Sequence, residues 1–398
     1  SLLAAAKHAH LLSQAGRFGV AAEAKIDFAE AMAHVERVIA SIAPNDSIER
    51  FTALGVKVIQ AEASFKDTRT VVAGEYTIRA RRFVIATGSR PAAPPIPGLD
   101  QVPFLTNETI FERAQRPPHL IVIGGGPVGL ELAQAHRRLG SRVSVVEAAD
   151  ALGNDDPELA ATVLKSLRAE GIELLEHTEV KRADKLGSNG IRIHVMGPDG
   201  TRTLDGSHLL VATGRRPNLE ALSLERAGIA FDAKGICVSS TLRTTNRRAY
   251  AIGDVAGGLQ FTHVANHHAG LVIRALLFRL PARENRSIIP RVTYTAPELA
   301  QIGLTERQAR QKHRGVRVLR HSFSDSDRAR AEDETEGFMK LVLGRGGRVL
   351  GVSIVGHGAG EMMHFWSLAL SRRMRARDLA SYVAPYPTFG EIGRKAAL

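Results

Sequence analysis

The feature that most constrains this chain is a glycine-rich turn between an apolar strand and a helix. The strand is predicted at residues 120–123, and Gly124, Gly126 and Gly129 follow in Gly-x-Gly-x-x-Gly spacing. In such a turn the first glycine permits the sharp bend, the second lets a pyrophosphate approach the backbone, and the third lets helix and strand pack closely. Pro127 suits the first turn of that helix, whose free amides and dipole attract a diphosphate. The pattern predicts a dinucleotide-binding unit, and a glycine-rich turn without a ligand is the alternative.

An acidic residue follows the next predicted strand, residues 142–146. Glu147 lies roughly 20 residues beyond the glycine turn, the distance at which a carboxylate binds the adenosine ribose hydroxyls of a dinucleotide. A carboxylate at this position repels a 2′-phosphate, and Ala148 and Ala149 follow it where an arginine would hold one. The sequence therefore favours NADH over NADPH as the ligand.

A hydrophobic strand that ends in Ala-Thr-Gly occurs twice, at residues 86–88 and 212–214. Ligands bind at the carboxyl ends of strands in doubly wound sheets, so two copies predict two such sheets, although each copy alone can be a plain strand end. Asp254 follows a third predicted strand, and its carboxylate can bind a polyol hydroxyl of a second cofactor or cap a helix.

The first part of the chain alternates helical and β-like patterns. Amphipathic helices are predicted at the start of the chain and at residues 27–42, and Pro44 ends the second helix. A proline-rich connector at residues 90–98 indicates a domain boundary. Between them lie short β-like runs at residues 56–60, 70–73, 76–79 and 83–86.

The rest of the chain divides into two kinds of pattern. From residue 120 to about residue 245 it is α/β, which predicts a parallel sheet with crossover helices. Near the C-terminus, β-rich runs at residues 337–344 and 348–355 are separated by a hairpin signal, and an apolar helix that contains Met362 and Trp366 follows. These signals predict an α+β C-terminal domain.

Length and composition limit the classes of function. At ~150 residues per domain, 398 residues suggest two or three domains. The net charge of +12 does not predict nucleic-acid binding, because the basic residues are spread along the chain and aromatic residues make up only 5%. No apolar run approaches the ~20 residues of a membrane span, so we expect none.

Cysteine and histidine usage narrows the chemistry further. The single cysteine, Cys237, excludes an internal disulfide and fits a reducing cytoplasm, and we expect it to be a small buried apolar residue. His263, His267 and His268 have helical spacing, but no third ligand lies near them in sequence. We therefore expect no metal site.

The order of these motifs resembles the flavoprotein pyridine nucleotide-disulfide oxidoreductases of class I, in particular the dihydrolipoamide dehydrogenase and mercuric reductase branch. The resemblance runs from Ser1 to Leu398. It rests on Ala-Thr-Gly-Ser-Arg-Pro, Gly-Gly-Gly-Pro-Val-Gly-Leu-Glu, Val-Val-Glu, Ala-Thr-Gly-Arg-Arg-Pro-Asn, Ala-Ile-Gly-Asp, Phe-Thr-His-Val-Ala, Thr-Ala-Pro-Glu-Leu-Ala-Gln-Ile-Gly-Leu-Thr-Glu and Pro-Tyr-Pro-Thr-Phe-Gly-Glu.

The resemblance implies an α/β fold with two doubly wound dinucleotide-binding domains and an α+β C-terminal dimerisation domain. Residues 1–116 with 247–286 would bind FAD, residues 117–246 would bind NAD, and residues 287–398 would form the homodimer. The implied FAD-site residues are Ala61, Thr87, Gly88, Ser89, Asp254, Gln260, Phe261, Thr262 and His263. The implied NAD-site residues are Gly124, Gly125, Gly126, Pro127, Val128, Gly129, Leu130, Glu131, Glu147, Val180 and Gly214.

The chain departs from the family pattern in two places. The family's first FAD-binding glycine motif and its redox-active Cys-x4-Cys are expected before Ser1, so we expect the chain to lack its N-terminal segment, which carries the lysine partner of Glu131. In the C-terminal motif Tyr386 replaces the usual histidine, while Glu391 is kept. A tyrosine of pKa ~10 is a poorer general base near neutrality than a histidine of pKa ~6.5, which favours the mercuric-reductase-like branch over dithiol chemistry.

The resemblance implies an enzyme that passes a hydride from NADH to FAD and on to a disulfide, a metal ion or another acceptor. Tyr386 and Glu391 would complete the active site of the partner subunit, and Glu131 would act near the flavin. Without the cysteine pair, we expect activity of this chain to be limited to flavin-mediated transfer to dyes, quinones or oxygen. A truncated, non-catalytic nucleotide-binding or dimerisation remnant is the alternative.

Overall fold

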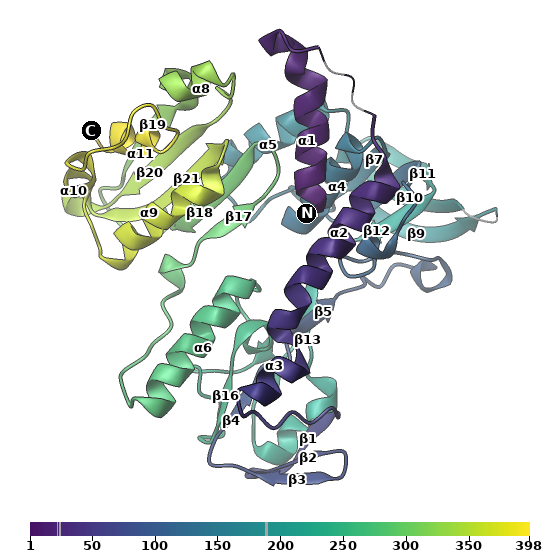
Figure 1. Cartoon of the computed structure of the whole chain (residues 1–398), viewed down its shortest axis with the longest axis vertical. Helices are drawn as coiled ribbons and strands as arrows, with labels where there is room; N and C mark the ends of the chain where they lie inside the picture. Colours follow the sequence, from purple (N-terminus) through teal and green to yellow (C-terminus); the bar gives the residue numbers. More distant parts are fainter. Residues whose placement is uncertain (22, 24, 188–189) are drawn as a thin grey trace. The chain divides into compact units, whose positions relative to one another are not determined.

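The computed structural model describes residues 1–21, 23, 25–187 and 190–398, which pack into two compact units (Figure 1). The first unit combines Ser1–Glu36, Ala93–Thr213 and Arg286–Leu398, and the second combines Arg37–Ala92 and Gly214–Asn285. Each unit therefore draws on segments that lie far apart in the sequence. The division into an FAD, an NAD and a dimerisation domain, with the boundaries given above, stays a prediction.

A parallel four-stranded sheet carries the glycine turn in the first unit. Its strand order is β12-β6-β7-β8, and helix α4 (Pro127–Arg138) connects β6 to β7, while α5 (Pro157–Ala169) connects β7 to β8. The strands are nearly continuous apolar runs, as expected for a sheet covered on both faces. The strand bounds are β6 His119–Ile123, β7 Arg142–Val146, β8 Glu173–Leu175 and β12 His208–Val211.

The prediction of a parallel sheet with crossover helices to about residue 245 is wrong for the strands between β8 and β12. Strands β9 (Glu179–Leu186), β10 (Gly190–Gly197) and β11 (Gly200–Gly206) form an antiparallel sheet. In β10 the buried side chains are Ile191, Ile193 and Val195, in strict alternation. This alternation, together with a tight turn at Gly197–Gly200, favours a hairpin over another strand–helix crossover.

A five-stranded antiparallel sheet in the order β17-β18-β21-β20-β19 occupies the C-terminal part of the first unit. The predicted hairpin is confirmed as β20 (Phe338–Leu343) and β21 (Val349–Gly356), and the predicted helix as α9 (Ala359–Ser371). Met363 and Trp366 of α9 are buried in the core of this region. The remaining bounds are β17 Arg291–Thr293, β18 Glu298–Gly303, β19 Arg317–Ser322, α7 Glu306–Lys312, α8 Asp327–Ala331, α10 Ala376–Ala380 and α11 Glu391–Ala397.

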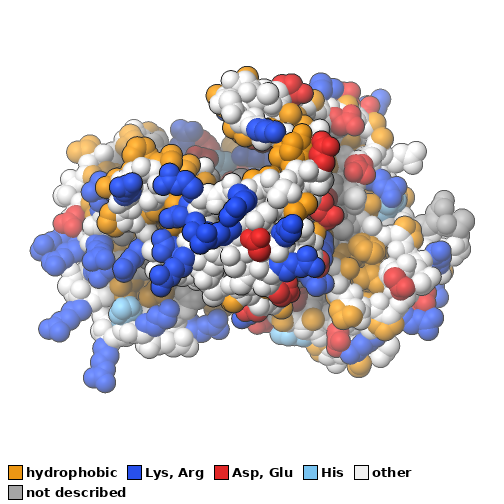
Figure 2. Space-filling model, turned by 90° about the horizontal axis from the view of Figure 1, so that it is seen from below, with side chains coloured by type: hydrophobic (Ala, Val, Ile, Leu, Met, Phe, Trp, Pro, Cys, Tyr) orange, Lys and Arg blue, Asp and Glu red, His pale blue; other side chains and the backbone are white. Residues whose placement is uncertain are grey.

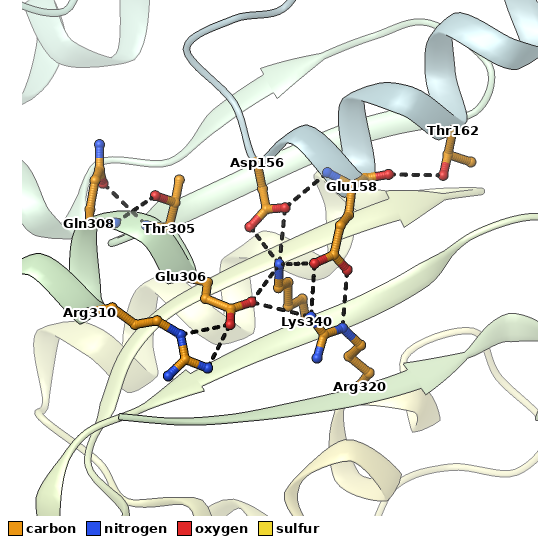
Figure 3. A network of polar contacts seen from close by, with 9 residues as sticks. All are labelled: Asp156, Glu158, Thr162, Thr305, Glu306, Gln308, Arg310, Arg320 and Lys340. Atoms are coloured by element: carbon orange, nitrogen blue, oxygen red, sulfur yellow. Dashed lines mark hydrogen bonds and ion pairs between the residues drawn. The ribbon is translucent and has the colours of Figure 1, made fainter. Parts of the chain in front are cut away.

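A buried ion network joins α5 to this sheet (Figure 3). Lys340 on β20 is 2% exposed, and its Nζ lies 2.9 Å from both Asp156 Oδ2 and Glu158 Oε1 and 2.8 Å from Glu306 Oε2. Burial alone would lower the pKa of Lys340, but its hydrogen bonds to these carboxylates raise the pKa above its usual value. Arg320 donates to Glu158 and lowers the pKa of that carboxyl to about 2. The network therefore holds charged groups of α5, α7, β19 and β20 together.

The second unit contains small sheets and two clusters of buried apolar residues. Strands β4 (Phe83–Ile85) and β16 (Ala249–Ala251) pair in parallel, and β5 (Ser89–Pro91) pairs antiparallel with β13 (Arg215–Pro217). Ile85, Ala249 and Ala251 are buried together with residues of a second small sheet. The other bounds are β1 Ala63–Asp67, β2 Thr70–Ala73, β3 Tyr76–Arg79, β14 Phe231–Asp232, β15 Gly235–Ile236 and α6 Thr262–Leu277.

The two helices predicted near the start of the chain are confirmed as α1 (Leu2–Gln14) and α2 (Phe28–Ile42). The strand predicted at residues 56–60 is wrong. A short helix, α3 (Ile48–Ala53), precedes this segment, and the Val56 N–H donates to the Phe51 carbonyl (3.0 Å). The amide that a strand would pair across a sheet is used here to end the helix, at a left-handed Gly55 (φ 84°).

The prediction that Cys237 is buried is also wrong, because Cys237 is exposed. It directly follows β15, where the preceding residue, Ile236, is 2% exposed. Successive side chains point to opposite sides of an extended chain, so the residue after buried Ile236 points outward.

The surface is mixed in character. Within the described part of the chain, no helix combines the length and apolarity needed to cross a bilayer. On the face drawn in Figure 2, Lys and Arg side chains are most numerous in the left half, where they lie among apolar ones, whereas the acidic side chains lie mainly in the centre and on the right.

Candidate nucleotide-binding sites

The glycine turn between β6 and α4 has the geometry that the sequence predicts. Gly124 adopts φ 115°, and a methyl group added there would lie 2.5 Å from the Ala212 carbonyl oxygen. A methyl group on Gly129 would lie 2.0 Å from the Gly124 carbonyl oxygen, so only glycine lets α4 approach β6 this closely. In contrast, a methyl group on Gly126, the N-cap of α4, would have no heavy atom within 4 Å. The turn is thus closed behind Gly124 and open at the helix N-terminus, where a diphosphate can bind.

Glu147 lies beside this turn, directly after β7. Its Oε2 accepts the Gly125 N–H (2.7 Å) and its Oε1 accepts the Ala149 N–H (2.9 Å). Ala148 and Ala149 are exposed. The main-chain amides hold the carboxylate in place, while its remaining lone pairs can accept two ribose hydroxyls.

The other residues predicted for this site lie at different depths. Leu130 is fully buried and Val128 is 43% exposed. Val180, on β9, is 8% exposed and packs in an apolar core with Ile121 and Ile123 of β6, so its side chain is not available to a ligand. Gly214 begins the second unit with φ 129°.

A second site is built around Asp254, in the 3₁₀ turn η7 (Gly253–Ala256) that follows β16. The Ser89 hydroxyl donates to Asp254 Oδ2 (2.6 Å), and Arg215 Nε donates to Ser89 Oγ (2.7 Å). The Arg215 Nε also lies 3.7 Å from the Asp254 carboxylate. Asp254 lies within the turn and Ile252 is its N-cap, so the helix-capping alternative is wrong.

A cavity of about 490 Å³ lies beside this carboxylate. It is lined by the predicted flavin-site residues Gly88, Asp254, Gln260 and Thr262, among others. Gly88 has φ 67°, and a methyl group added there would have no heavy atom within 4 Å, so the main chain is open to a ligand. A carboxylate beside open main chain fits a hydroxyl-rich chain such as that of a flavin nucleotide.

The remaining residues predicted for this site lie outside the lining of the cavity. The Thr87 hydroxyl donates to the Asn218 carbonyl (2.9 Å), and the Asn218 amide donates back to Thr87 O (2.9 Å). The Phe261 and His263 rings stack at 5.2 Å. Ala61 is exposed just before β1.

The sequence did not predict the roles of Arg215, Asn218 and His268 at this site. The repeat gave no signal for Arg215, because the Arg-Pro pairs that follow the two Ala-Thr-Gly copies are Arg90-Pro91 and Arg216-Pro217, and Arg215 aligns with Ser89. The two segments, β5 and β13, pair with each other. His268 was noted only as one of three histidines with helical spacing, and nothing in the sequence indicated its role. It is 1% exposed, its Nδ1 accepts the Gly253 N–H (3.1 Å), and its Nε2 lies 3.0 Å from Glu284 Oε1. It therefore supports the turn that carries Asp254.

Glu131, on α4, has an unusual environment in the first unit. Burial raises its pKa to about 7, although the Tyr294 N–H donates to its Oε1 (2.8 Å) and lowers the pKa in part. Glu131 and Tyr294 line a cleft of about 1060 Å³, which α1 also borders. A carboxyl of this pKa exchanges its proton near neutral pH.

The predicted C-terminal pair, Tyr386 and Glu391, is exposed in part. Tyr386 is 69% exposed, and its hydroxyl donates to Asp327 Oδ2 (2.9 Å), which raises the pKa of the phenol. Glu391 begins α11 and lies 3.6 Å from Lys395 Nζ. Between them, the Phe389 ring packs on His357 and Phe323 and fixes the segment.

Comparison with known proteins decides which family these sites belong to. The family model described as pyridine nucleotide-disulphide oxidoreductase matches residues 4–269, and that of the same family's dimerisation domain matches residues 289–397. The chain belongs to the pyridine nucleotide-disulphide oxidoreductase family.

Relatives in this family cover most or all of the chain. A mercuric reductase of Streptomyces lividans is 34% identical over 406 residues, which cover 100% of this chain and 85% of the relative. Dihydrolipoyl dehydrogenase 3 of Pseudomonas aeruginosa is 37% identical over 331 residues, or 82% of this chain and 70% of the relative. The HOCl-induced flavoprotein disulfide reductase RclA from Escherichia coli has a TM-score of 0.87 at 25% identity, with 99% of this chain and 88% of the other covered.

These similarities confirm the predicted family, the fold class and the kind of enzyme. This member of the pyridine nucleotide-disulphide oxidoreductases is an FAD-dependent NAD(P)H oxidoreductase. The dimerisation domain supports a homodimer. The alternative of a non-catalytic remnant is not favoured. The residue roles, the choice of nucleotide and the acceptor belong to the proposal that follows.

Proposed function

We propose that this oxidoreductase takes its hydride from NADH in preference to NADPH and delivers the electrons to a metal ion, with a disulfide as the second candidate acceptor. The observation that carries the choice of nucleotide is the Glu147 carboxylate, which main-chain amides hold beside the open turn at Gly126. A fixed negative charge there binds two ribose hydroxyls and repels a 2′-phosphate.

The two sites have separate tasks. In the first unit, the amides at the start of α4 bind the pyrophosphate of NADH, and Glu147 binds its adenosine ribose. In the second unit, Asp254, Gly88 and Thr262 hold the flavin nucleotide. When bound, FAD accepts a hydride from NADH and passes two electrons to the acceptor.

The acceptor side is proposed to involve Tyr386 and Glu391 of the partner subunit. Tyr386 stands where the family resemblance predicts a histidine, and its pKa is raised further by Asp327. A phenol of this kind is a weak base near neutrality but can bind a metal ion or donate a hydrogen bond. The relative named mercuric reductase suggests a soft divalent ion, which two electrons reduce to the element. Cys237 is the single cysteine of the 398 residues, so an internal cysteine pair is not proposed. A bound flavin would instead pass its electrons directly to the metal ion, an acceptor beyond the dyes, quinones or oxygen expected above for this chain.

The experiment uses the purified 398-residue chain reconstituted with FAD. We expect anaerobic NADH to bleach the flavin absorbance with at least tenfold higher kcat/KM than NADPH, because Glu147 opposes the 2′-phosphate. Equal or better use of NADPH contradicts the choice of nucleotide.

The acceptor is tested separately by steady-state NADH oxidation with mercuric ion or oxidised lipoamide. Faster turnover with mercuric ion, which Tyr386→Phe reduces, supports the metal-ion proposal. Faster turnover with lipoamide replaces it by the disulfide candidate. A matched control is Tyr76→Phe, because Tyr76 is an exposed tyrosine of β3 in the second unit.

A further inference from the structure

The loop that carries Glu147 lies against a turn formed by residues 176–178, which follow β8. The His177 N–H donates to the Ala149 carbonyl (3.2 Å), and the Thr178 N–H donates to the Glu147 carbonyl (2.9 Å). The hydrogen bonding between β7 and β8 thus continues beyond both strands. As a result, a second segment supports the residue proposed to bind the ribose.

One side chain of this turn reaches the loop directly. Glu176 Oε1 accepts the Ala151 N–H (2.9 Å), while its Oε2 lies 2.5 Å from Arg168 Nη2 on α5. Ala151 is 3% exposed and the Glu176 side chain is 20% exposed. The carboxylate therefore joins the loop to α5, and it satisfies an amide that is buried away from water.

Ala151 in turn supports the glycine turn and Glu147. A methyl group on Gly125 would lie 2.9 Å from Ala151 Cβ and 3.0 Å from Glu147 Cβ, so these two side chains together fill the space that a side chain on Gly125 would occupy. The Leu152 N–H donates to the Gly125 carbonyl (3.0 Å), and the Gly125 N–H donates to Glu147 Oε2 (2.7 Å). A shift of Ala151 therefore moves the main chain on which the Glu147 carboxylate rests.

From these contacts we propose that Glu176 is a positioning residue that keeps Glu147 oriented for selection of NADH over NADPH. The inference rests on the proposed function and names a part of the same site that does not touch the nucleotide. Without the Glu176 oxygen, the Ala151 N–H is buried and has no hydrogen-bond acceptor, which costs free energy. The loop that carries Glu147 and Ala151 lowers this free-energy cost by moving so that the N–H reaches water. The Glu147 carboxylate is then no longer oriented to accept hydrogen bonds from the ribose hydroxyls, and it no longer lies where it repels a 2′-phosphate.

The test measures the dissociation constants of NADH and NADPH, by nucleotide fluorescence, for Glu176→Ala and Glu176→Gln. For Glu176→Ala we expect NADH to bind about tenfold more weakly and NADPH to bind at least as well as in the wild type. The ratio of the NADPH to the NADH dissociation constant should therefore fall about tenfold. Glu176→Gln keeps an oxygen that accepts the Ala151 N–H, so the wild-type preference returns. Arg168→Met is the matched control, because it removes the ion pair and leaves the Ala151 contact in place.

A lower melting temperature with an unchanged NADH to NADPH ratio in Glu176→Ala overturns the proposal, since a merely structural residue would behave in this way. Equal effects of Glu176→Gln and Glu176→Ala also overturn it. If Glu176→Ala does not fold, Glu176→Asp withdraws the oxygen by one methylene, and we expect it to narrow the preference in the same direction. Glu147→Ala distinguishes failure of the proposed function from failure of this inference. If Glu147→Ala leaves NADH affinity unchanged, the proposed ribose site is refuted. If Glu147→Ala weakens NADH binding but Glu176→Ala does not, only the inference about Glu176 is refuted.

Discussion

Glu147 in the first unit and Asp254 in the second are carboxylates in similar positions, each at the end of a parallel strand and close to a glycine. They are held in different ways. Main-chain amides of Gly125 and Ala149 hold Glu147, whereas the side chains of Ser89 and Arg215 surround Asp254. Main-chain donors are present whatever the neighbouring side chains are. Side-chain donors depend on two particular residues.

The difference determines how far each site follows from local sequence. The donors to Glu147 come from the glycine turn and from its own loop, so a short pattern specifies them. The Ser89 donor to Asp254 lies 165 residues away in the chain. Only the folded second unit brings it to Asp254, and substitutions at distant positions should therefore affect the flavin site more than the nicotinamide nucleotide site.

The largest loss of stability and of NADH binding is expected at the glycine turn of the first unit, where main-chain geometry alone forms the site. Gly129→Ala places a methyl group 2.0 Å from the Gly124 carbonyl oxygen, so α4 must move away from β6. We expect the free energy of unfolding to fall by about 3 kcal/mol, measured by urea denaturation, and NADH binding to be lost in fluorescence titration.

Gly126→Ala is the matched control for this change, because a methyl group there meets no atom of the protein within 4 Å. Its stability should stay close to that of the wild type, while its bulk at the pyrophosphate position weakens NADH. Equal stability of the two variants would contradict the role assigned to the close packing at Gly129.

The next effect tests the side-chain support of Asp254. Arg215→Met removes the guanidinium that donates to Ser89 Oγ and to Ser89 O (2.7 Å each). Because these bonds orient the Ser89 donor to Asp254, we expect FAD to bind about thirtyfold more weakly, which corresponds to ~2 kcal/mol, as measured by release of flavin fluorescence.

Arg216→Met is the control, since Arg216 pairs with Glu220 on the surface with both side chains mostly exposed. It should leave FAD affinity unchanged. If the two arginine variants lose FAD equally, net charge rather than the contact with Ser89 supports the site.

The same contrast explains how much the sequence predicts. The β6–turn–α4 unit and Glu147 follow from glycine spacing, because sterics near Gly124 and Gly129 allow few alternatives. The repeated Ala-Thr-Gly predicts two strand ends but not that the Arg-Pro segments after them pair with each other. His268 and Glu176 escape prediction because their partners are main-chain amides in other segments. The strand predicted at residues 56–60 is wrong because their β-like composition does not show that the Val56 N–H donates to the last turn of α3.

A smaller effect is expected from Glu147 itself, because its main-chain donors keep the loop in place when its charge is removed. Glu147→Gln should weaken NADH binding about tenfold and strengthen NADPH binding, since hydrogen bonds to a charged acceptor are the stronger ones. Isothermal titration with both nucleotides measures the change. Asp150→Asn, at an exposed position nearby, should change neither affinity, and unchanged NADH binding in Glu147→Gln would remove the basis for the choice of nucleotide.

Glu131 is a third carboxylate to compare with Glu147 and Asp254. It accepts a hydrogen bond from the Tyr294 N–H, but burial has the larger effect and raises its pKa to about 7. A carboxyl with a raised pKa binds its proton more tightly in the folded state, so its contribution to stability is complete below pH ~4.5 and is lost as the pH rises through 7. Between these limits we expect the wild-type chain to lose on the order of 1 kcal/mol relative to Glu131→Gln, after allowance for its partly exposed side chain. Urea denaturation at a series of pH values measures this, with Glu179→Gln, an exposed carboxylate on β9, as the control that keeps the wild-type slope. A Glu131→Gln chain with the same pH slope as the wild type would show that the Glu131 carboxyl is ionised as easily in the folded chain as in the unfolded chain, and that the contact with Tyr294 balances its burial.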